Sequence, residues 1–489
     1  MEIQLHNIGV IQDASIKLDG LTVITGKNET GKTTVGKALY ALIDAVSDLP
    51  EKTRRDRNAY VWEQLRKIID HLTVLRVLPT SSDALTDYPT LLHLSDPLSV
   101  YKLRTSNTNL EELAFKVSQE LKLYQQRFES GKLDIADSSV NALMTAIGKF
   151  VPKHIQDLEK MFIAINQDPE LIHYARESIH QTLNVEFSGQ TQPLNAIEKQ
   201  SGIQLTDQET AYFDIIIWKN HVTNENAFFY SPFKSVYMVD DPFILDQLSP
   251  FDEYVNFWED DSSFEEGNSA YDPFMRSHVD KEGFLKPTGI KNHRERLSDL
   301  LYRLPHISVL EQTILNTTLR PVTEKMDQVL PGTFNFEGGY YIREDGTKLR
   351  ISNLAAGSKM FSIVKILLEH GLLNEDTLLI LDEPETYLHP KWQNQFAEII
   401  VLLVKELRVK VLLTTHSSNF MLAIDAYMRK YEINDVSNFY HTRQLENGFV
   451  VHDCVNDNME EIYGDFLDYL SEAKVLRDRY LTDDEEEIW

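Results

Sequence analysis

The first 46 residues carry the hydrophobic pattern of strands followed by a helix. Residues 3–5 and 16–18 alternate between apolar and polar side chains, which predicts two strands of an antiparallel β-edge. Residues 21–25 are mostly apolar and predict a third strand, and Asp19-Gly20 before it is typical of a tight turn between neighbouring strands. After Thr33 the spacing becomes helical, and we expect a helix that runs to about Val46.

The middle of the chain has mostly helical periodicity. Between about residues 55 and 220, apolar side chains such as Trp62, Leu65 and Leu72 recur at helical spacing. Prolines interrupt this stretch, and no heptad persists for three or four repeats, so the pattern does not predict a long coiled coil. We therefore expect a compact, mostly helical insertion over residues 51–230, with its aromatic residues packed in its own core.

Strand patterns return in the second half of the chain. They lie at residues 235–239, 340–343, 348–351, 377–381 and 409–413, and the second and third of these predict a hairpin. The sequence thus predicts an α/β fold in which one head is split by the insertion. We expect the head in residues 1–50 and 335–425, a return into the head with an acidic loop in 231–334, and a strand, a helix and an acidic tail in 426–489.

Composition limits the class of protein. The chain has 489 residues and a formal net charge of −28, which favours solubility and opposes broad adhesion to nucleic acid. It has no apolar run long enough to cross a membrane and no signal-peptide pattern, and Cys454 is its single cysteine. These features predict a cytoplasmic protein without disulfides. Residues 251–272 hold eight acidic residues and no basic one, which indicates either a solvated loop or a docking site for a basic partner.

The most specific motif joins the third strand to the first helix. Gly26, four intervening residues and Gly31-Lys32-Thr33 form the Gly-x-x-x-x-Gly-Lys-Thr phosphate loop in its strand–loop–helix setting. The glycines let backbone N–H groups turn toward phosphates, Lys32 reaches the β- and γ-phosphates, and the Thr33 hydroxyl is a ligand for Mg²⁺. Asn28 and Thr34 complete the predicted binding loop. The sequence therefore predicts binding of ATP with Mg²⁺.

Two later strands end in residues suited to the same chemistry. Residues 377–381 lead into Asp382-Glu383, and we expect this strand beside the phosphate-loop strand, with Asp382 as a Mg²⁺ ligand and Glu383 as the general base. Residues 409–413 lead toward His416, a candidate sensor of the γ-phosphate. Catalysis is accordingly predicted to rest on Glu383, His416 and Lys32. Leu354, Gly357 and Ser358 belong to a small-residue turn that opens another helix and presents N–H groups to an anion.

In this order, these motifs resemble those of ABC-type ATPase heads. The run Glu385-Thr386-Tyr387-Leu388-His389-Pro390 narrows the resemblance to the branch of overcoming-lysogenization-defect nucleases, repair ATPases and related defence ATPases. The resemblance implies a head-to-head dimer or higher oligomer, in which Leu354–Ser358 of one subunit completes the ATP site of the other. Residues 354–358 match the signature motif of these heads and are called the signature turn below. Ala355 stands where that motif usually has Ser, and without the Ser hydroxyl we expect slow hydrolysis. Gln247 and Asp240 are candidates for the loop that senses Mg²⁺.

The same resemblance suggests a biological role. The 73 residues after His416 are too few for the Toprim nuclease domain of the nuclease relatives, so a nuclease is expected on a separate chain. The profile is similar to the PtuA-type ATPases of Septu and retron-linked anti-phage systems, whose partner is an HNH nuclease of the PtuB type. A Toprim partner, as in the PARIS system, is the nearest rival. Nucleic acid or a complex of reverse transcriptase with RNA and DNA is a further partner to consider.

Three alternatives remain open from the sequence. A DNA-repair type ABC ATPase would bind DNA directly and in a salt-sensitive manner. An ABC ATPase with a nuclease site of its own would cleave nucleic acid without a partner. A scaffold would bind ATP without hydrolysing it, which Ala355 makes plausible.

Overall fold

The computed structural model describes most of the chain. The described residues are 1–75, 85, 87–105, 109–130, 138–166, 171–224, 227–228, 230–247, 285–305, 319–335, 339–460, 462–464, 471–472 and 474–475. The chain divides into two compact units, one formed by residues 1–47, 175–254 and 290–489 and the other by residues 48–174 and 255–289. The expected acidic loop at 251–272 and most of the expected C-terminal helix and tail lie outside the described residues.

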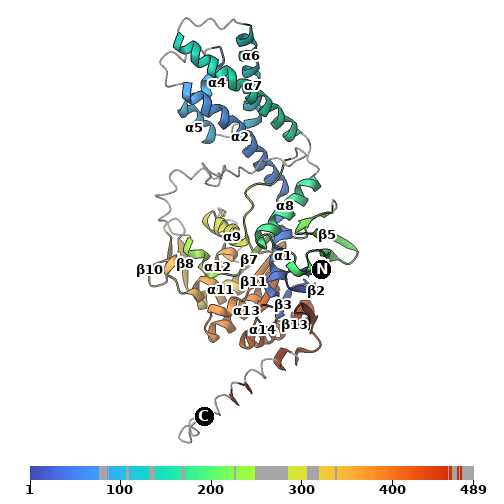
Figure 1. The fold of residues 1–489 in the computed structure, drawn as a ribbon. Helices are drawn as coiled ribbons and strands as arrows, with labels where there is room; N and C mark the ends of the chain where they lie inside the picture. Colours follow the sequence, from blue (N-terminus) through green and yellow to red (C-terminus); the bar gives the residue numbers. More distant parts are fainter. Residues whose placement is uncertain are drawn as a thin grey trace. The chain divides into compact units, whose positions relative to one another are not determined.

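The first unit is built on one eleven-stranded sheet with the strand order β6-β5-β4-β1-β2-β14-β13-β3-β12-β11-β7 (Figure 1). β13, β3, β12, β11 and β7 are parallel, whereas β1, β2, β4 and β5 pair antiparallel. The strands span β1 (Glu2–Ile8), β2 (Ile11–Lys17), β3 (Leu21–Thr25), β4 (Ser201–Asp207), β5 (Thr210–Trp218), β6 (His221–Val222), β7 (Ser235–Val239), β11 (Thr377–Asp382), β12 (Lys410–Thr415), β13 (Ser437–Gln444) and β14 (Val450–Cys454).

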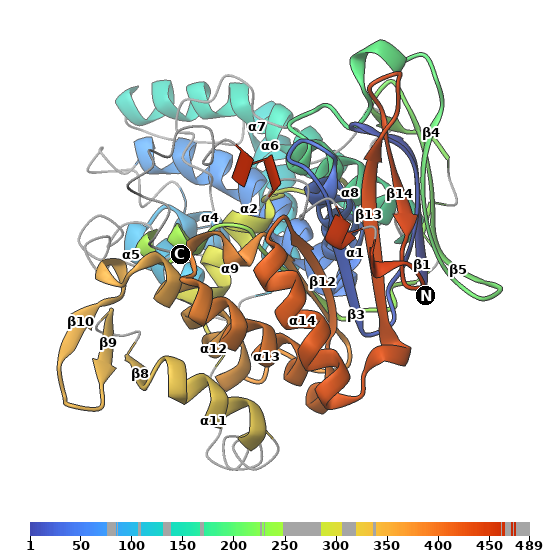
Figure 2. The ribbon, with the colours of Figure 1, turned by 90° about the horizontal axis from the view of Figure 1, so that it is seen from below.

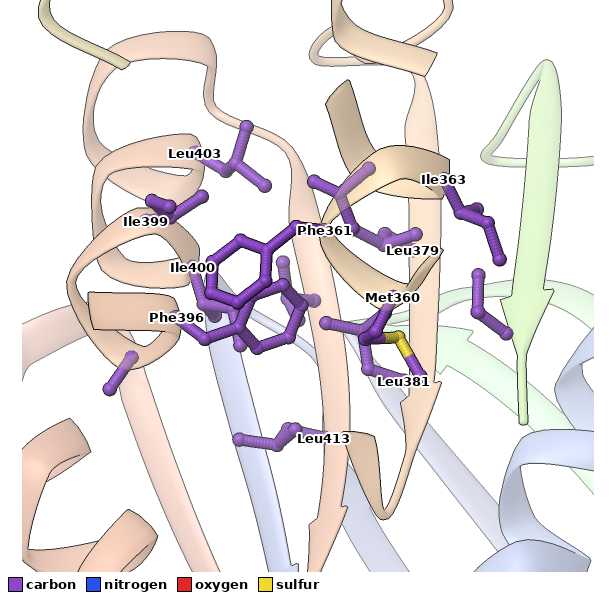
Figure 3. Close-up of a cluster of buried hydrophobic side chains, with 14 of the residues drawn as sticks. Met360, Phe361, Ile363, Leu379, Leu381, Phe396, Ile399, Ile400, Leu403 and Leu413 are labelled. Atoms are coloured by element: carbon purple, nitrogen blue, oxygen red, sulfur yellow. The ribbon is translucent and has the colours of Figure 1, made fainter. Parts of the chain in front are cut away.

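Strand β11 is apolar on both faces because helices cover both. Along a strand, side chains point alternately to the two sides. Ile380 of β11 faces α1 (Lys32–Val46), where a Cβ on Gly36 would lie 3.0 Å from its side chain. Its neighbours Leu379 and Leu381 face the other way, into a fully buried cluster with side chains of α12 (Ala356–Glu369) and α13 (Pro390–Leu407), as Figure 3 shows.

Further helices pack beside α12 and α13, and other short elements surround the sheet. α14 (Ser418–Tyr431) packs against α13, and Figure 2 shows α11, α12, α13 and α14 gathered on one side of the sheet. A separate three-stranded sheet has the order β10-β9-β8. The other bounds are α8 (Leu171–Glu186), η1 (Leu194–Ala196), η2 (Pro242–Gln247), α9 (His293–Tyr302), α11 (Arg320–Val329), β8 (Gly332–Asn335), β9 (Tyr340–Arg343), β10 (Lys348–Arg350), η6 (Ile351–Asn353), η7 (Pro384–Tyr387) and η8 (Asn434–Val436).

The second unit is helical in its described part. α2 packs on α6 and α7, and α4 packs on α6, with the predicted apolar positions Trp62, Leu65 and Leu72 of α2 buried. No helix among the described residues of either unit is long and apolar enough to span a membrane. The helices of the second unit are α2 (Leu49–Leu75), α4 (Pro89–Leu94), α5 (Pro97–Thr105), α6 (Leu110–Glu129) and α7 (Ser138–Asn166).

The secondary structure confirms several predictions and corrects others. The N-terminal antiparallel strands, the helix to Val46, the hairpin at 340–351 and the strand at 235–239 are all present. The stretch between about residues 55 and 220 was expected to be mostly helical, and residues 201–222 depart from this: they form β4, β5 and β6, which extend the sheet beside β1. Pro152 lies inside α7, a helix that packs against α2 and α6, rather than interrupting it.

Strand pairing was also predicted incorrectly in two places. The turn at Asp19-Gly20 does not join a hairpin, because β14 and β13 lie between β2 and β3 in the sheet. The strand that ends in Asp382 is not beside the phosphate-loop strand, because β12 pairs with both β3 and β11. In each case the partner strand comes from a distant part of the chain, which local patterns do not specify.

Candidate nucleotide site

A cavity of about 700 Å³ opens where β3 meets α1 and where β11 ends. Both strands end at the same edge of the sheet because they run parallel, so their terminal residues meet there. The cavity is lined by Val10, Asn28, Glu29, Thr30, Gly31, Lys32, Thr33, Thr34, Asp382, Glu383, Gln444 and Gly448.

The loop between β3 and α1 has a conformation that depends on its two glycines. Gly26 has a φ of 147° and Gly31 has a φ of 76°. Residues other than glycine rarely adopt these positive values. Gly31 is the N-cap of α1, so the free N–H groups of the first helical turn point toward the cavity. Thr442 of β13 donates a hydrogen bond to the Thr30 hydroxyl over 2.7 Å and supports the loop from the side. The loop is therefore shaped to receive an anion.

Lys32 is held among acceptors at the floor of the loop. Its Nζ donates to the carbonyl oxygens of Gly26 at 3.1 Å and Lys27 at 2.7 Å, and it lies 3.4 Å from Oε1 of Glu383. The Lys32 side chain is only 4% exposed. A buried ammonium group in a loop of N–H donors makes this part of the cavity favourable for phosphate oxygens.

Asp382 links the end of β11 to the phosphate loop. One of its carboxylate oxygens accepts a hydrogen bond from Thr33 at 2.7 Å, and the other accepts one from Thr414 at 2.6 Å. Burial raises the pKa of Asp382, while the two hydroxyl donors act in the opposite direction. Thr33 and Asp382 thus present oxygen ligands side by side, which is the donor set that Mg²⁺ prefers.

Glu383 occupies a special backbone position next to Asp382. Its φ of 48° is left-handed, and its N–H donates to the Thr414 hydroxyl at 3.0 Å, which fixes the turn. Its carboxylate lies between Lys32 and His416, with 3.1 Å between Oε2 and Nδ1 of the histidine. The Glu383 side chain is 30% exposed, so solvent reaches it from the cavity. A carboxylate with access to both water and a bound phosphate can act as a general base.

His416 is positioned by Glu385, a residue that was not among the predicted site residues. Glu385 is 2% exposed, and its Oε1 accepts hydrogen bonds from the Thr415 hydroxyl and from the backbone N–H of His416. Burial raises the pKa of Glu385, and the Thr415 hydrogen bond partly offsets this effect. Glu385 therefore anchors the end of β12 that presents His416 beside Glu383.

The signature turn does not join this cavity within one chain. Leu354 and Gly357 are buried, Ala355 is exposed, and none of the residues from 354 to 358 is among the cavity lining. Gly357 packs so closely on η7 that a Cβ would lie 3.0 Å from the carbonyl oxygen of Tyr387. The candidate residues Leu354, Gly357 and Ser358 are thus placed at the start of α12, apart from Lys32 and Glu383.

The two candidates for a Mg²⁺-sensing loop have other surroundings. Asp240, after β7, accepts hydrogen bonds from Arg294 and lies 3.0 Å from Nε2 of His293, so it is part of a buried polar cluster. Gln247 is exposed at the end of η2 and does not line the cavity. Neither residue is among those that the loop and β11 bring together.

One wall of the cavity consists of residues that were not among the predicted site residues. Val10 lies in the turn between β1 and β2, and Gln444 and Gly448 belong to the end of β13 and the turn before β14. The only neighbour predicted for the phosphate-loop strand was the strand that ends in Asp382, whereas β13 pairs with β3 on the opposite side. Residues 437–444 carry no regular alternation of apolar and polar side chains, so no local pattern predicts β13.

The match to a family model agrees with this geometry. The model described as "AAA ATPase domain" matches residues 1–421, and the chain belongs to this family. The protein is therefore an ATPase with an α/β head, and its ATP-binding function follows from the family. No curated protein matches the chain.

Solved structures that are similar to the chain include heads of SMC proteins. The SMC head domain from Thermotoga maritima has 8% identity and a TM-score of 0.34, over 93% of this chain and 98% of that chain. The Smc head domain with a coiled coil and joint from Pyrococcus yayanosii has 11% identity and a TM-score of 0.32, over 97% and 99%. The Smc head with an extended coiled coil, bound to the C-terminal domain of ScpA, from Pyrococcus furiosus has 10% identity and a TM-score of 0.29, over 95% and 98%.

Proposed function

We propose that this ATPase works as a head-to-head dimer that holds and licenses a separate effector nuclease in antiviral defence. The observation that carries the dimer is the separation of the two halves of the site. Lys32, Asp382 and Glu383 line one cavity, whereas the signature turn opens α12 elsewhere on the same unit. A second copy would bring its own signature turn to the open side of the cavity.

In this proposal each residue of the cavity has a distinct task. Lys32 exchanges the carbonyl oxygens of the loop for phosphate oxygens, because a doubly charged acceptor competes well for an ammonium group. Thr33 and Asp382 hold Mg²⁺, which would neutralise charge on the phosphates. Glu383 accepts the proton of the attacking water, and His416 beside it contacts the γ-phosphate. The hydrolysed state no longer offers that phosphate, so the two heads separate.

The nuclease part of the proposal is supported by the resemblance of the motifs to PtuA-type defence ATPases. We place the complex in the cytoplasm and infer an HNH nuclease as the partner. ATP-dependent closure of the two heads would hold the nuclease inactive or release it, since a ligand that binds one conformation better shifts the population toward it.

The test compares the chain alone with the chain purified together with the product of the neighbouring open reading frame. ATP turnover and nucleic-acid cleavage are measured on both samples, for wild type, Glu383→Gln and the control Glu406→Gln on the exposed side of α13. We expect cleavage only with the neighbour, altered by Glu383→Gln and unchanged by Glu406→Gln. Cleavage by the chain alone would overturn the licensing role and favour a nuclease site within this chain.

A further inference from the structure

The cavity extends well beyond the residues that suit phosphate and metal. Glu383 and Asp382 end β11, which lies two strands from β3 on one side. Gln444 ends β13, which pairs with β3 on the other side. Strands in a sheet are about 4.8 Å apart, so these two walls are separated by three spacings, or roughly 14 Å. A triphosphate whose terminal phosphate lies near Glu383 therefore has room for its nucleoside on the β13 side of the cavity.

The wall on that side is held together by backbone hydrogen bonds. The N–H of Val450 donates to the carbonyl oxygen of Val10 at 3.0 Å, and the N–H of Gly448 donates to the carbonyl oxygen of Leu445 at 3.0 Å. The β1–β2 turn also contacts the phosphate loop, since a Cβ on Gly31 would lie 3.1 Å from Val10 Cγ2. The β13–β14 hairpin and the β1–β2 turn thus form one wall that is fixed relative to the loop.

This wall contributes three groups with suitable chemistry. Val10 is 41% exposed and offers an apolar surface for the face of a base. Gly448 leaves space, because a Cβ built on it would meet no atom within 4 Å. Gln444 is exposed and lines the cavity, and within the described part of the chain its side-chain amide makes no hydrogen bond. An unused carboxamide in a ligand cavity is available to read a hydrogen-bonding edge.

We propose that Gln444 is a specificity-determining residue that reads the adenine of ATP. A carboxamide presents one acceptor and one donor side by side, which match the N6 amino group and N7 of adenine. Guanine has acceptors at both corresponding positions, so the Gln444 oxygen would face the guanine O6 without a proton between them. The inference rests on the ATPase activity and on this cavity, and it does not depend on the dimer or on the nuclease.

The experiment measures the dissociation constants and KM values of ATP, GTP and 7-deaza-ATP, which lacks the N7 acceptor. For wild type we expect ATP to bind about tenfold more tightly than either analogue. In Gln444→Ala, the affinity for ATP falls about tenfold, and ATP and 7-deaza-ATP become equal. The change in KM exceeds the change in kcat, because the contact is made in the ground state and in the transition state alike.

Two variants separate base reading from damage to the hairpin. Asn447 lies in the same hairpin as Gln444 but outside the cavity lining, and Asn447→Ala removes its hydrogen bonds to Gln12 Oε1 of β2 and from the N–H of Phe449. It should leave the preference for ATP over GTP unchanged. Gln444→Glu keeps an acceptor for the N6 amino group but has no donor for N7, so it should retain that preference and lose the penalty for 7-deaza-ATP. An equal penalty for 7-deaza-ATP in wild type and Gln444→Ala would overturn the proposal. A wild-type chain that binds neither ATP nor GTP would instead overturn the cavity as the nucleotide site, and the proposed function with it.

Discussion

The hydroxyl of Thr33 donates a hydrogen bond to Oδ2 of Asp382 over 2.7 Å, although the two residues are 349 positions apart in the chain. This contact joins the first turn of α1 to the end of β11 and places two oxygen ligands in one corner of the cavity. The second oxygen of Asp382 is bonded by Thr414, so the carboxylate has a fixed orientation. The Thr33 hydroxyl and the Asp382 carboxylate, held in fixed positions, are suitable oxygen ligands for a divalent cation.

The first prediction concerns the cation requirement. Asp382→Asn keeps an oxygen for Thr33 but removes the negative charge, so we expect the Mg²⁺ concentration for half-maximal ATP turnover to rise about tenfold or more. The measurement is ATP turnover as a function of Mg²⁺ concentration. Asp376→Asn, just before β11 and paired with Lys234 at the surface, is the matched control. An unchanged requirement in Asp382→Asn would show that Mg²⁺ binds elsewhere.

The second prediction concerns the shape of the phosphate loop. In Gly26→Ala, the new Cβ would lie 1.7 Å from Oγ1 of Thr442, at a φ of 147°. The loop or β13 must move, and we expect the free energy of unfolding to fall by about 1–3 kcal/mol and ATP binding to be lost. Thermal unfolding and equilibrium ATP binding provide the measurements.

Two further variants distinguish the clash from backbone strain. Thr442→Ala in the Gly26→Ala background removes the nearest atom, and we expect it to recover part of the lost stability. Gly189→Ala is strained by its φ of 80° but meets no atom within 4 Å, so it should cost less stability and leave ATP binding intact. Equal losses in Gly26→Ala and Gly189→Ala would assign the effect to strain alone.

The third prediction concerns pH. Burial by itself would lower the pKa of His293, but hydrogen bonds to Asp240 and Glu186 raise it to about 9. Because the folded-state pKa lies above the unfolded value of about 6.5, the stabilisation is complete below pH 6.5 and disappears as the pH rises through 9. A shift of this size corresponds to roughly 3 kcal/mol. We expect the unfolding temperature of the wild type to fall across that alkaline range.

The companion carboxylate acts at the other end of the pH scale. Burial would raise the pKa of Asp240, whereas hydrogen bonds from His293 and Arg294 lower it to about 2, so its stabilisation is lost as the pH falls from about 4 toward 2. His293→Gln should have a lower unfolding temperature at pH 6 and lack the alkaline decline. His6→Gln, at an exposed position beside Asp13, should match the wild type at every pH. An identical alkaline decline in wild type and His293→Gln would refute the assignment.

The sequence was sufficient for the parts of the site that are local in the chain. The phosphate loop, the strand ending in Asp382-Glu383 and the turn before His416 each follow from spacing within about ten residues. What could not be predicted depends on pairing between distant segments. In the sheet, β12 lies between β3 and β11, and β13 supplies the second wall of the cavity. These neighbours are far apart in the sequence, and no local residue pattern indicates which distant strands will pair. The same limitation hid the cluster of Glu186, Asp240 and His293.

The last prediction tests whether the site is completed by a second copy. Lys32→Ala disables the phosphate loop, and Ser358→Arg at the half-buried start of α12 blocks the signature turn. Each variant alone should have almost no ATP turnover. In a mixed head-to-head dimer, however, one of the two sites combines an intact phosphate loop with an intact signature turn. With random pairing we expect the equimolar mixture to recover about a quarter of wild-type turnover.

A matched mixture supplies the control for this complementation. Lys32→Ala and Glu383→Gln both affect residues of the same cavity, so no pairing of these two variants restores a complete site. Their mixture should remain inactive while the mixture of Lys32→Ala with Ser358→Arg recovers activity. If neither mixture recovers, or if Ser358→Arg alone retains full turnover, each chain hydrolyses ATP without a signature turn from its partner. If only the mixture of Lys32→Ala with Ser358→Arg recovers activity, Leu354–Ser358 acts on the nucleotide of the other subunit. Only a site shared between two subunits can combine two separately defective chains into an active one.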